Sequence, residues 1–447
     1  MDVFRTENNC LKFHYDAEEL WIQPWGANSF RIRATKLAEM PKENWALEMP
    51  VEDIVPKIQI EEKRASIING KIKAVISSYG KLTIYNSKDE ILLDEYLRNR
   101  LDVFADYCSA LDIEAREFKP ILGGDYHLSM RFVSNPEEKI YGMGQYQQPY
   151  LNLKGTDLEL AQRNSQASVP FAVSSLGYGF LWNNPGVGRV MFGKNITTWE
   201  AYSTKVLDYW ITAGDSPAEI EEAYASVTGT VPMMPDYAMG FWQCRERYKS
   251  SDELCDVLDR YRELGIPLDG IVQDWQYWGC DSNWNAMKFM NPRYINAMGD
   301  EKWMRYLPNG EDPNANYPEP RIKSPKEMVD YVHKHNAHLM ISIWPSFGPW
   351  TDQYKELKEI NALLPVITWP RNSGAQPYDP FNPKAREIYW KYLRNLYDMD
   401  IDAWWTDATE PDHFDRKDKD FDFMTPDGTF RSVHNAYPLM SNKGIYE

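Results

Sequence analysis

The chain has 447 residues, with 49 Lys and Arg against 66 Asp and Glu, so its formal net charge is −17. At about 150 residues per domain this length predicts two or three domains, and 43% hydrophobic residues are enough to build their cores. A polyanion is repelled by phosphate backbones and by anionic lipid, which argues against nucleic-acid binding and against binding to membranes. The first residues lack a basic segment followed by an apolar one, so a cytoplasmic protein is expected if Met1 is the true start.

Cysteine and histidine spacing predicts neither a metal site nor a cofactor. Three histidines, His333, His335 and His338, lie on a predicted helix and just after it, without carboxylates at ligand spacing, so they are interpreted as surface residues. The cysteines are odd in number, widely spaced and without a C-x-x-C pair, and they are predicted to be buried reduced thiols. They are Cys10, Cys108, Cys244, Cys255 and Cys280.

The first half of the chain predicts an antiparallel β-sandwich over residues 1–232. Short runs of alternating apolar and polar residues, such as SFRIRAT, KIKAVISSYG, YHLSMRFV and KVLDYWITAG, are separated by turn residues between Leu20 and Gly214. Each strand is expected to bury one face and to expose the other. A helix is predicted over 216–227, and the proline-rich TVPMMPDY is interpreted as a linker with the domain boundary at 232–235.

The second half, residues 236–447, alternates strands and helices. Apolar runs at 238–244, 268–275, 337–345 and 401–410 are separated by amphipathic helices with Ser or Asn caps, which predicts parallel strands covered by helices. A doubly wound open sheet also fits, but no glycine-rich phosphate turn follows any of these strands. Polar and aromatic residues at the strand ends are typical of a (β/α)₈ barrel instead. About four of its eight strands are present, so the chain is expected to be a fragment of a longer protein or one piece of a split one.

The first candidate site residue is Asp407, in the segment WWTDATEP. A carboxylate at the end of a buried strand, directly after two indoles, is costly to keep ionised unless a ligand or a partner uses it. The alternative is that Asp407 caps a following helix. Pro411 and the polar run after it argue against a prompt helix, which favours a functional role.

The second candidate is Asp274, in IVQDWQYW, again at a strand end beside aromatic residues. Alone it fits a structural cap equally well, but two carboxylates at one end of a parallel sheet predict a shared acidic and aromatic pocket. Such a pocket suits hydroxyl-rich ligands. Trp344 ends the third strand and fits a wall of this pocket, although a single Trp more often belongs to the core. Nucleophilic Ser or Cys catalysis lacks support, because no G-x-S-x-G segment occurs and Cys244 has no nearby His in the sequence.

These segments resemble glycoside hydrolase family 31. The similar motifs are WWTDATEPD, GFWQCRERYKS, GIPLDGIVQDWQYWG and HLMISIWP, together with YGMGQ and the stretch from VPF to LWNNP upstream. The resemblance extends over nearly the whole chain from about Leu20, with the motifs in the family's order.

The resemblance implies a role for each site residue. Asp407 matches the nucleophile of a retaining α-glycosidase, and Asp274 matches the residue that holds sugar hydroxyls. Trp344 and Trp405 match the aromatic walls around the sugar that is cleaved off, and Glu410 matches an acidic residue that orders the site. Retaining hydrolysis needs a second carboxyl group about 5–5.5 Å from the nucleophile. In the family this acid/base comes from barrel segments beyond the fourth strand, so none is expected in this chain and the fragment alone is expected to be inactive.

Within the family, the GFWQxRERY and QDWQYWG segments are similar to α-xylosidases that remove non-reducing-end α-xylose from xyloglucan-type oligosaccharides. Trp275 follows Asp274, and its bulk near C5 of the sugar would exclude the hydroxymethyl group of glucose. An α-glucosidase remains the alternative. A non-catalytic carbohydrate-binding or inactive remnant is the alternative of another class. The expected partner is an oligosaccharide. A homo-oligomer is left open for the complete protein.

Overall fold

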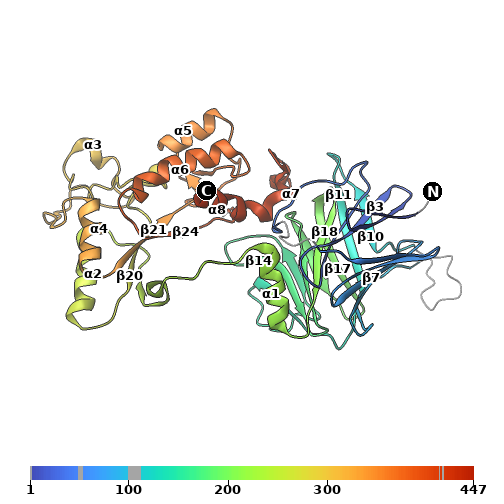
Figure 1. The fold of residues 1–447 in the computed structure, drawn as a ribbon. Coiled ribbons are helices and arrows are strands. Elements are labelled where there is room, and N and C mark those ends of the chain that lie inside the picture. The colour runs from blue at the N-terminus through green and yellow to red at the C-terminus, as the bar shows by residue number, and fades with distance from the viewer. Residues whose placement is uncertain (1–2, 49–53, 99–111, 412, 415–416) are drawn as a thin grey trace. The chain divides into compact units, whose positions relative to one another are not determined.

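The computed structural model describes residues 3–48, 54–98, 112–411, 413–414 and 417–447. The chain divides into two compact units, Met1–Val231 with Thr429–Ala436, and Pro232–Gly428 with Tyr437–Glu447 (Figure 1). The sequence places a boundary at 232–235, but it does not predict that Thr429–Ala436 groups with the first unit. No helix in the described ranges is long and apolar enough to cross a membrane.

The first unit contains three sheets in which every neighbouring pair of strands is antiparallel. The eight-stranded sheet has the order β1 (Phe4–Glu7), β2 (Cys10–Tyr15), β3 (Glu18–Pro24), β4 (Ser29–Thr35), β18 (Leu207–Ala213), β15 (Tyr178–Trp182), β14 (Ala167–Ser174) and β12 (Ile140–Gln145). One five-stranded sheet has the order β10 (Arg116–Pro120), β11 (Tyr126–Val133), β17 (Ile196–Thr204), β16 (Gly188–Phe192) and β13 (Asp157–Leu160). The other has the order β5 (Lys57–Ile60), β6 (Arg64–Asn69), β7 (Ile72–Ser77), β8 (Leu82–Asn86) and β9 (Ile91–Asp94).

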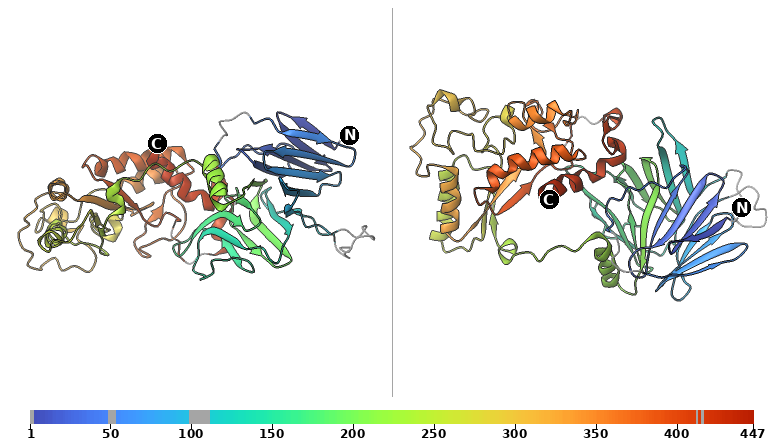
Figure 2. Two further views of the ribbon diagram at one scale, coloured as in Figure 1. Left: turned by 60° about the horizontal axis from the view of Figure 1, so that its bottom comes forward. Right: turned by 45° about the horizontal axis from the view of Figure 1, so that its top comes forward.

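The central strands of the eight-stranded sheet are buried on both faces. Every residue of β4 and β18 is buried. One face joins a core shared with the other two sheets. Helix α1 (Pro217–Thr228) lies beside the sheet (Figure 1 and Figure 2), and its Ile220 belongs to a second buried cluster with Trp210 of β18. The expectation of one solvent-exposed face is therefore wrong for these strands. Helix α1 packs on β18 and β15, and the backbone of the segment after β4 covers β4, where Arg31 and Arg33 donate to the carbonyls of Glu43 and Pro41. Ser216 caps α1 by accepting a hydrogen bond from the Glu219 N–H, at the predicted start of this helix.

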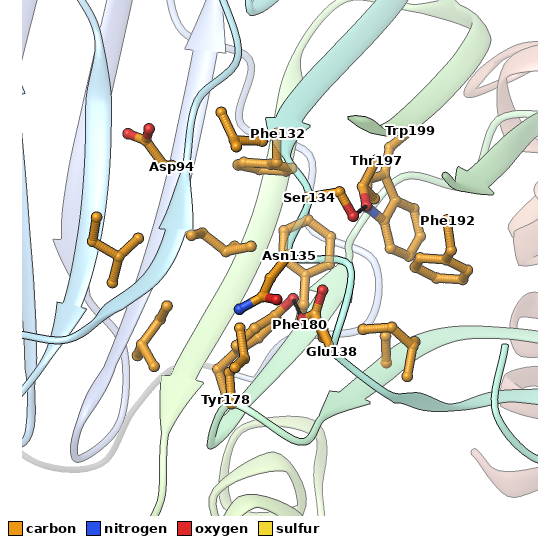
Figure 3. A pocket seen from close by; sticks show the side chains of 17 residues that line it. Asp94, Phe132, Ser134, Asn135, Glu138, Tyr178, Phe180, Phe192, Thr197 and Trp199 are labelled. Carbon is orange, nitrogen blue, oxygen red and sulfur yellow. Dashed lines mark hydrogen bonds between the residues drawn. The ribbon is translucent and has the colours of Figure 1, made fainter. Parts of the chain in front are cut away.

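A cavity of about 190 Å³ lies inside the first unit, walled by aromatic side chains that include Phe132, Phe180 and Trp199 (Figure 3). Buried Glu138 lines it and accepts three hydrogen bonds. The hydroxyls of Ser174 and Tyr178 each donate over 2.6 Å, and Lys154 Nζ lies 2.9 Å from the other carboxylate oxygen. The carboxylate is thus satisfied within the protein, as a buried charge must be.

This buried pair predicts a large stability effect for Lys154→Met. The lysine and glutamate side chains are each 6% exposed, and removing one partner of a buried pair costs about 3–5 kcal/mol because the other charge stays buried. Lys119→Met is the matched control, since Lys119 is 65% exposed where it pairs with Glu117, and such surface pairs contribute about 0–1 kcal/mol. Hydrogen exchange of the β15 amides measures the free energy of unfolding in both variants. Equal protection in the two variants would contradict the prediction.

The second unit contains a parallel sheet in the order β19 (Trp242–Gln243), β20 (Gly270–Gln273), β21 (His338–Ile343) and β24 (Ala403–Thr406). The four strands lie in the predicted segments and in the predicted parallel order. The first is shorter than predicted, because residues 236–239 form a 3₁₀ turn, η1 (Asp236–Met239). The sheet is open rather than a closed barrel, with β19 and β24 at its edges.

Helices between these strands begin at the predicted caps. Ser250 caps α2 (Ser251–Glu263), Ser324 caps α4 (Pro325–Lys334) and Asn382 caps α6 (Pro383–Tyr397), each with a side-chain oxygen that accepts a backbone N–H. The other helices and short strands are α3 (Glu301–Met304), α5 (Asp352–Glu359), α8 (Tyr437–Tyr446), β22 (Ser346–Phe347), β23 (Gln376–Pro377), β25 (Met424–Thr425) and β26 (Gly428–Thr429).

Helix α7 (Phe430–Val433) lies in the segment that groups with the first unit. Asn435, which follows α7, holds this segment in place, because its side-chain amide donates to the carbonyls of Leu160 and Gly186 over 2.9 Å each. The same side chain accepts the Gln162 N–H over 3.0 Å.

The cysteines only partly match the prediction. Cys10, Cys255 and Cys280 are buried and not in disulfides, whereas Cys244 is exposed, so the prediction is wrong for Cys244. Its exposure follows from its place in the loop after β19 rather than within the strand. Cys108 lies outside the described residues.

Two of the three histidines share one carboxylate at the amino-terminal end of the sheet. His333 Nε2 and His338 Nδ1 lie 2.9 and 3.0 Å from the Asp402 oxygens. Burial raises the pKa of Asp402, but the Leu339 N–H and these two histidines outweigh it and hold the pKa below its ordinary value. Within the described part of the chain, no group of three or more His, Cys, Asp or Glu side chains could hold a metal ion.

Candidate active site

Strand register brings the predicted site residues to one face of the parallel sheet. Gln273 pairs with Ile341, and Ser342 pairs with Trp405. Paired residues of neighbouring strands point to the same side, and successive residues alternate sides. Asp274, Ser342 and Trp405 therefore share a face. Trp344 and Asp407 each follow directly after the end of their strand, at the carboxyl end of the sheet.

Asp407 follows β24 directly and does not cap a helix. Its N–H donates to the Ile343 carbonyl over 2.9 Å, which extends the pairing of β24 with β21 by one residue. The chain then turns at Ala408, whose φ is 51°, and the next helical segment in the described residues is η3 (Asp418–Phe421). The helix-cap alternative is therefore wrong for Asp407.

Asp274 is held in place by two donors and has a perturbed pKa. The Trp275 N–H donates to Oδ1 over 2.8 Å, and the Ser342 hydroxyl also hydrogen-bonds the carboxylate. The pKa of Asp274 is raised to about 6: burial raises it most, the charges of Asp407 and Glu246 also raise it, and the hydrogen bonds from Trp275 and Ser342 partly oppose the rise. The effect of Asp407 on this pKa places the two carboxylates near each other. No helix begins at Asp274, because the next helical turn, η2 (Asp281–Asn283), follows Cys280.

The backbone and the ring of Trp344 are each held by contacts with other residues. Its backbone carbonyl accepts hydrogen bonds from Asn285 Nδ2 over 2.5 Å and from the Tyr389 hydroxyl over 3.0 Å. Its indole Nε1 lies 3.2 Å from Ser342 Oγ, and the ring packs edge-to-face on Trp284 at 4.9 Å. Backbone and ring are thus both fixed before any ligand arrives.

The two remaining indoles differ in their surroundings. Trp275 is half-buried and packs against Trp284, with ring centroids 5.5 Å apart. Trp405 is 44% exposed on β24, the edge strand of the sheet. Apolar surface of this size beside two carboxylates offers a stacking face for a sugar ring.

Glu410 is half-buried and lies on the turn after Asp407. The pKa of the buried Tyr437, at the start of α8, is raised mainly by burial and in small part by the charge of Glu410. Glu410 therefore lies within electrostatic reach of Tyr437.

Sequence reasoning missed several side chains that build the site. Ser342 joins Asp274 to Trp344, and Asn285 and Tyr389 hold the Trp344 carbonyl. A polar residue inside the apolar run HLMISIW was the available signal for Ser342. Nothing local marks Asn285 or Tyr389, because their partner is distant in the chain. Arg247 lies in the RERY segment, whose individual residues have no role predicted from the sequence.

Comparison with known proteins places this geometry in a family. A profile described as the Glycosyl hydrolases family 31 TIM-barrel domain matches residues 231–447, and one described as the Glycosyl hydrolase 31 N-terminal galactose mutarotase-like domain matches residues 19–190. An uncharacterized family 31 glucosidase, ORF2 of Pseudescherichia vulneris, is 36% identical over 98% of this chain and 79% of its own length. The chain belongs to glycosyl hydrolase family 31. The resemblance inferred from the motifs is confirmed.

Other members of family 31 are similar over shorter parts of their own length. An α-xylosidase of Saccharolobus solfataricus is 35% identical over 72% of this chain and 41% of its own. The crystal structure of a GH31 α-xylosidase from a soil metagenome, complexed with xylose, superimposes with a TM-score of 0.86 at 39% identity, over 99% of this chain and 62% of that one. The chain therefore spans less than two thirds of both α-xylosidases.

Proposed function

We propose that this chain is part of a retaining, exo-acting α-glycosidase that removes α-xylose from the non-reducing ends of xyloglucan-type oligosaccharides. The observation that carries the proposal is the meeting of Asp407, Asp274 and Trp344 at the carboxyl end of the sheet, with Trp275 directly after Asp274. The similarity to two proteins named as α-xylosidases supports the choice of xylose.

In the proposed mechanism Asp407 attacks the anomeric carbon and forms a covalent glycosyl–enzyme intermediate. Asp274 accepts hydrogen bonds from sugar hydroxyls, and Trp344 and Trp405 enclose the ring. Glu410 orders the turn that presents Asp407. A second carboxyl group must protonate the leaving oxygen and then activate water. We place this acid/base outside strands β19, β20, β21 and β24, because the family resemblance assigns it to later barrel segments. The residues described here are then inactive by themselves.

Trp275 is the proposed source of selectivity for xylose over glucose. Its backbone N–H is bonded to Asp274 Oδ1, and its indole packs between Trp284 and the Arg247 guanidinium, which restrains it from moving aside for a hydroxymethyl group. In the complete protein, Trp275→Ala is expected to lower the ratio of kcat/KM for aryl α-xyloside over aryl α-glucoside by about 10- to 200-fold, the range known for pocket discrimination of small groups. Trp21→Ala is the control, because Trp21 lies on β3 of the first unit.

Steady-state kinetics of the complete protein without substitutions, measured on the two aryl glycosides, tests the function itself. Faster cleavage of the α-glucoside would favour the α-glucosidase alternative. Cleavage of neither would favour a carbohydrate-binding or inactive remnant. An unchanged ratio in Trp275→Ala would remove Trp275 from its role in selectivity.

A further inference from the structure

The loop between β19 and α2 carries two arginines with different surroundings. Arg245 Nη1 donates to Glu253 of α2 over 2.7 Å, so its charge is used within the fold. Arg247, two residues later, donates no hydrogen bond within the described part of the chain. Its nearest carboxylate is Glu246, at 3.6 Å.

The Arg247 guanidinium lies on a wall of the candidate site. Its central carbon is 4.8 Å from the centroid of the Trp275 ring, a cation–π distance. The side chain is 24% exposed, while its Nε is buried and has no hydrogen-bond partner. A guanidinium has five N–H donors, and a buried donor without a partner is rare enough to require an explanation.

The same loop reaches the carboxylate of the site. The charge of Glu246 contributes to the raised pKa of Asp274, after the larger effect of burial. The Glu246 side chain is 76% exposed, so it marks the side of the site that faces solvent. Arg247 and Glu246 thus form a loose ion pair at 3.6 Å, too long for a hydrogen bond, at the rim next to Trp275.

We propose that Arg247 and Glu246 bind the leaving-group sugar, with the guanidinium donating to its hydroxyls and the carboxylate accepting from them. This inference rests on the proposed function and deepens it, because it assigns a hydroxyl-bearing sugar to the leaving-group side. Asp274, Asp407 and Trp344 surround the xylose, which leaves the partly exposed rim to the next residue of the oligosaccharide. An aryl leaving group has no hydroxyls for these two side chains to recognise.

The test compares two substrates in the complete protein, a xylosyl-glucose disaccharide and p-nitrophenyl α-xyloside. Arg247→Met keeps the unbranched stem over Trp275 and removes the donors. For the disaccharide, KM is expected to rise at least about 10-fold, the loss for a hydrogen bond to a charged group, with kcat changed little. For the aryl xyloside, KM is expected to change less than threefold. Arg245→Met is the matched control and leaves both substrates unaffected.

Binding decides the inference independently of turnover. Calorimetry measures the affinity for the disaccharide in two proteins, Asp407→Ala and the double variant Asp407→Ala/Arg247→Met. The double variant is expected to bind the disaccharide at least about 10-fold more weakly, as in the kinetic test. Unchanged affinity, no binding in either variant, or equal losses of kcat/KM on both substrates would overturn the role of Arg247. Turnover by the complete protein without substitutions tests the proposed function separately, so the two failures are distinguishable.

Discussion

Asp407→Ala in the complete protein is expected to lower kcat on aryl α-xylosides by about four orders of magnitude or more, the scale seen when a nucleophile is removed. Asp407 extends the β24–β21 pairing and belongs to a turn rather than a helix, so the fold is expected to persist without its carboxylate. Asp398→Ala is the control, because Asp398 lies at the end of α6 and is 59% exposed.

Covalent trapping checks the same assignment directly. A mechanism-based fluorinated xyloside is expected to label Asp407, and mass spectrometry of the proteolysed protein identifies the modified peptide. Substantial remaining activity in Asp407→Ala, or a label on another residue, would remove Asp407 from the role of nucleophile.

The second large effect is expected for Asp274→Asn, with a pH signature. Burial raises the pKa of Asp274 to about 6, so its carboxylate is mostly protonated below this pH and mostly ionised above it. A carboxylate that accepts sugar hydroxyls must be ionised, so kcat/KM is expected to rise as the pH increases through about 6. Asp274→Asn is expected to lose this rise and to lower kcat/KM about 10²-fold or more, since hydrogen bonds to a charged group contribute about 1.5–3 kcal/mol each.

Asp379→Asn is the matched control for this profile. Burial also raises the pKa of Asp379 to about 6, but its carboxylate accepts the Phe381 N–H at the start of the segment leading into α6. Asp379→Asn is therefore expected to keep the rise. A profile that falls above pH 6 and loses its fall in Asp274→Asn would identify Asp274 as a proton donor instead. A covalent label on Asp274 would exchange its role with that of Asp407.

Features that depend on neighbouring residues in the chain were predictable from the sequence. The caps at Ser250, Ser324 and Asn382 act within one helical turn, so the helices begin where local chemistry indicates. The same holds for the four parallel strands and for the placement of Asp274 and Asp407 at strand ends. Because parallel strands end on one edge of their sheet, the prediction that these two carboxylates share a site required no tertiary information.

Features that depend on distant segments were decided by the tertiary structure alone. Helix α1 packs on β15 as well as on its chain neighbour β18, and Thr429–Ala436 groups with the first unit. Both depend on contacts between segments that are distant in the chain. Ser342 hydrogen-bonds Asp274, and the Tyr389 hydroxyl donates to the Trp344 carbonyl. Strand register brings the first pair together, and helix packing brings the second. The sequence alone did not indicate a role for Arg247. Its guanidinium lies over Trp275, with Nε lacking a hydrogen-bond partner among the described residues, only because β19 pairs with β20. The role of a side chain depends on the residues that surround it in space.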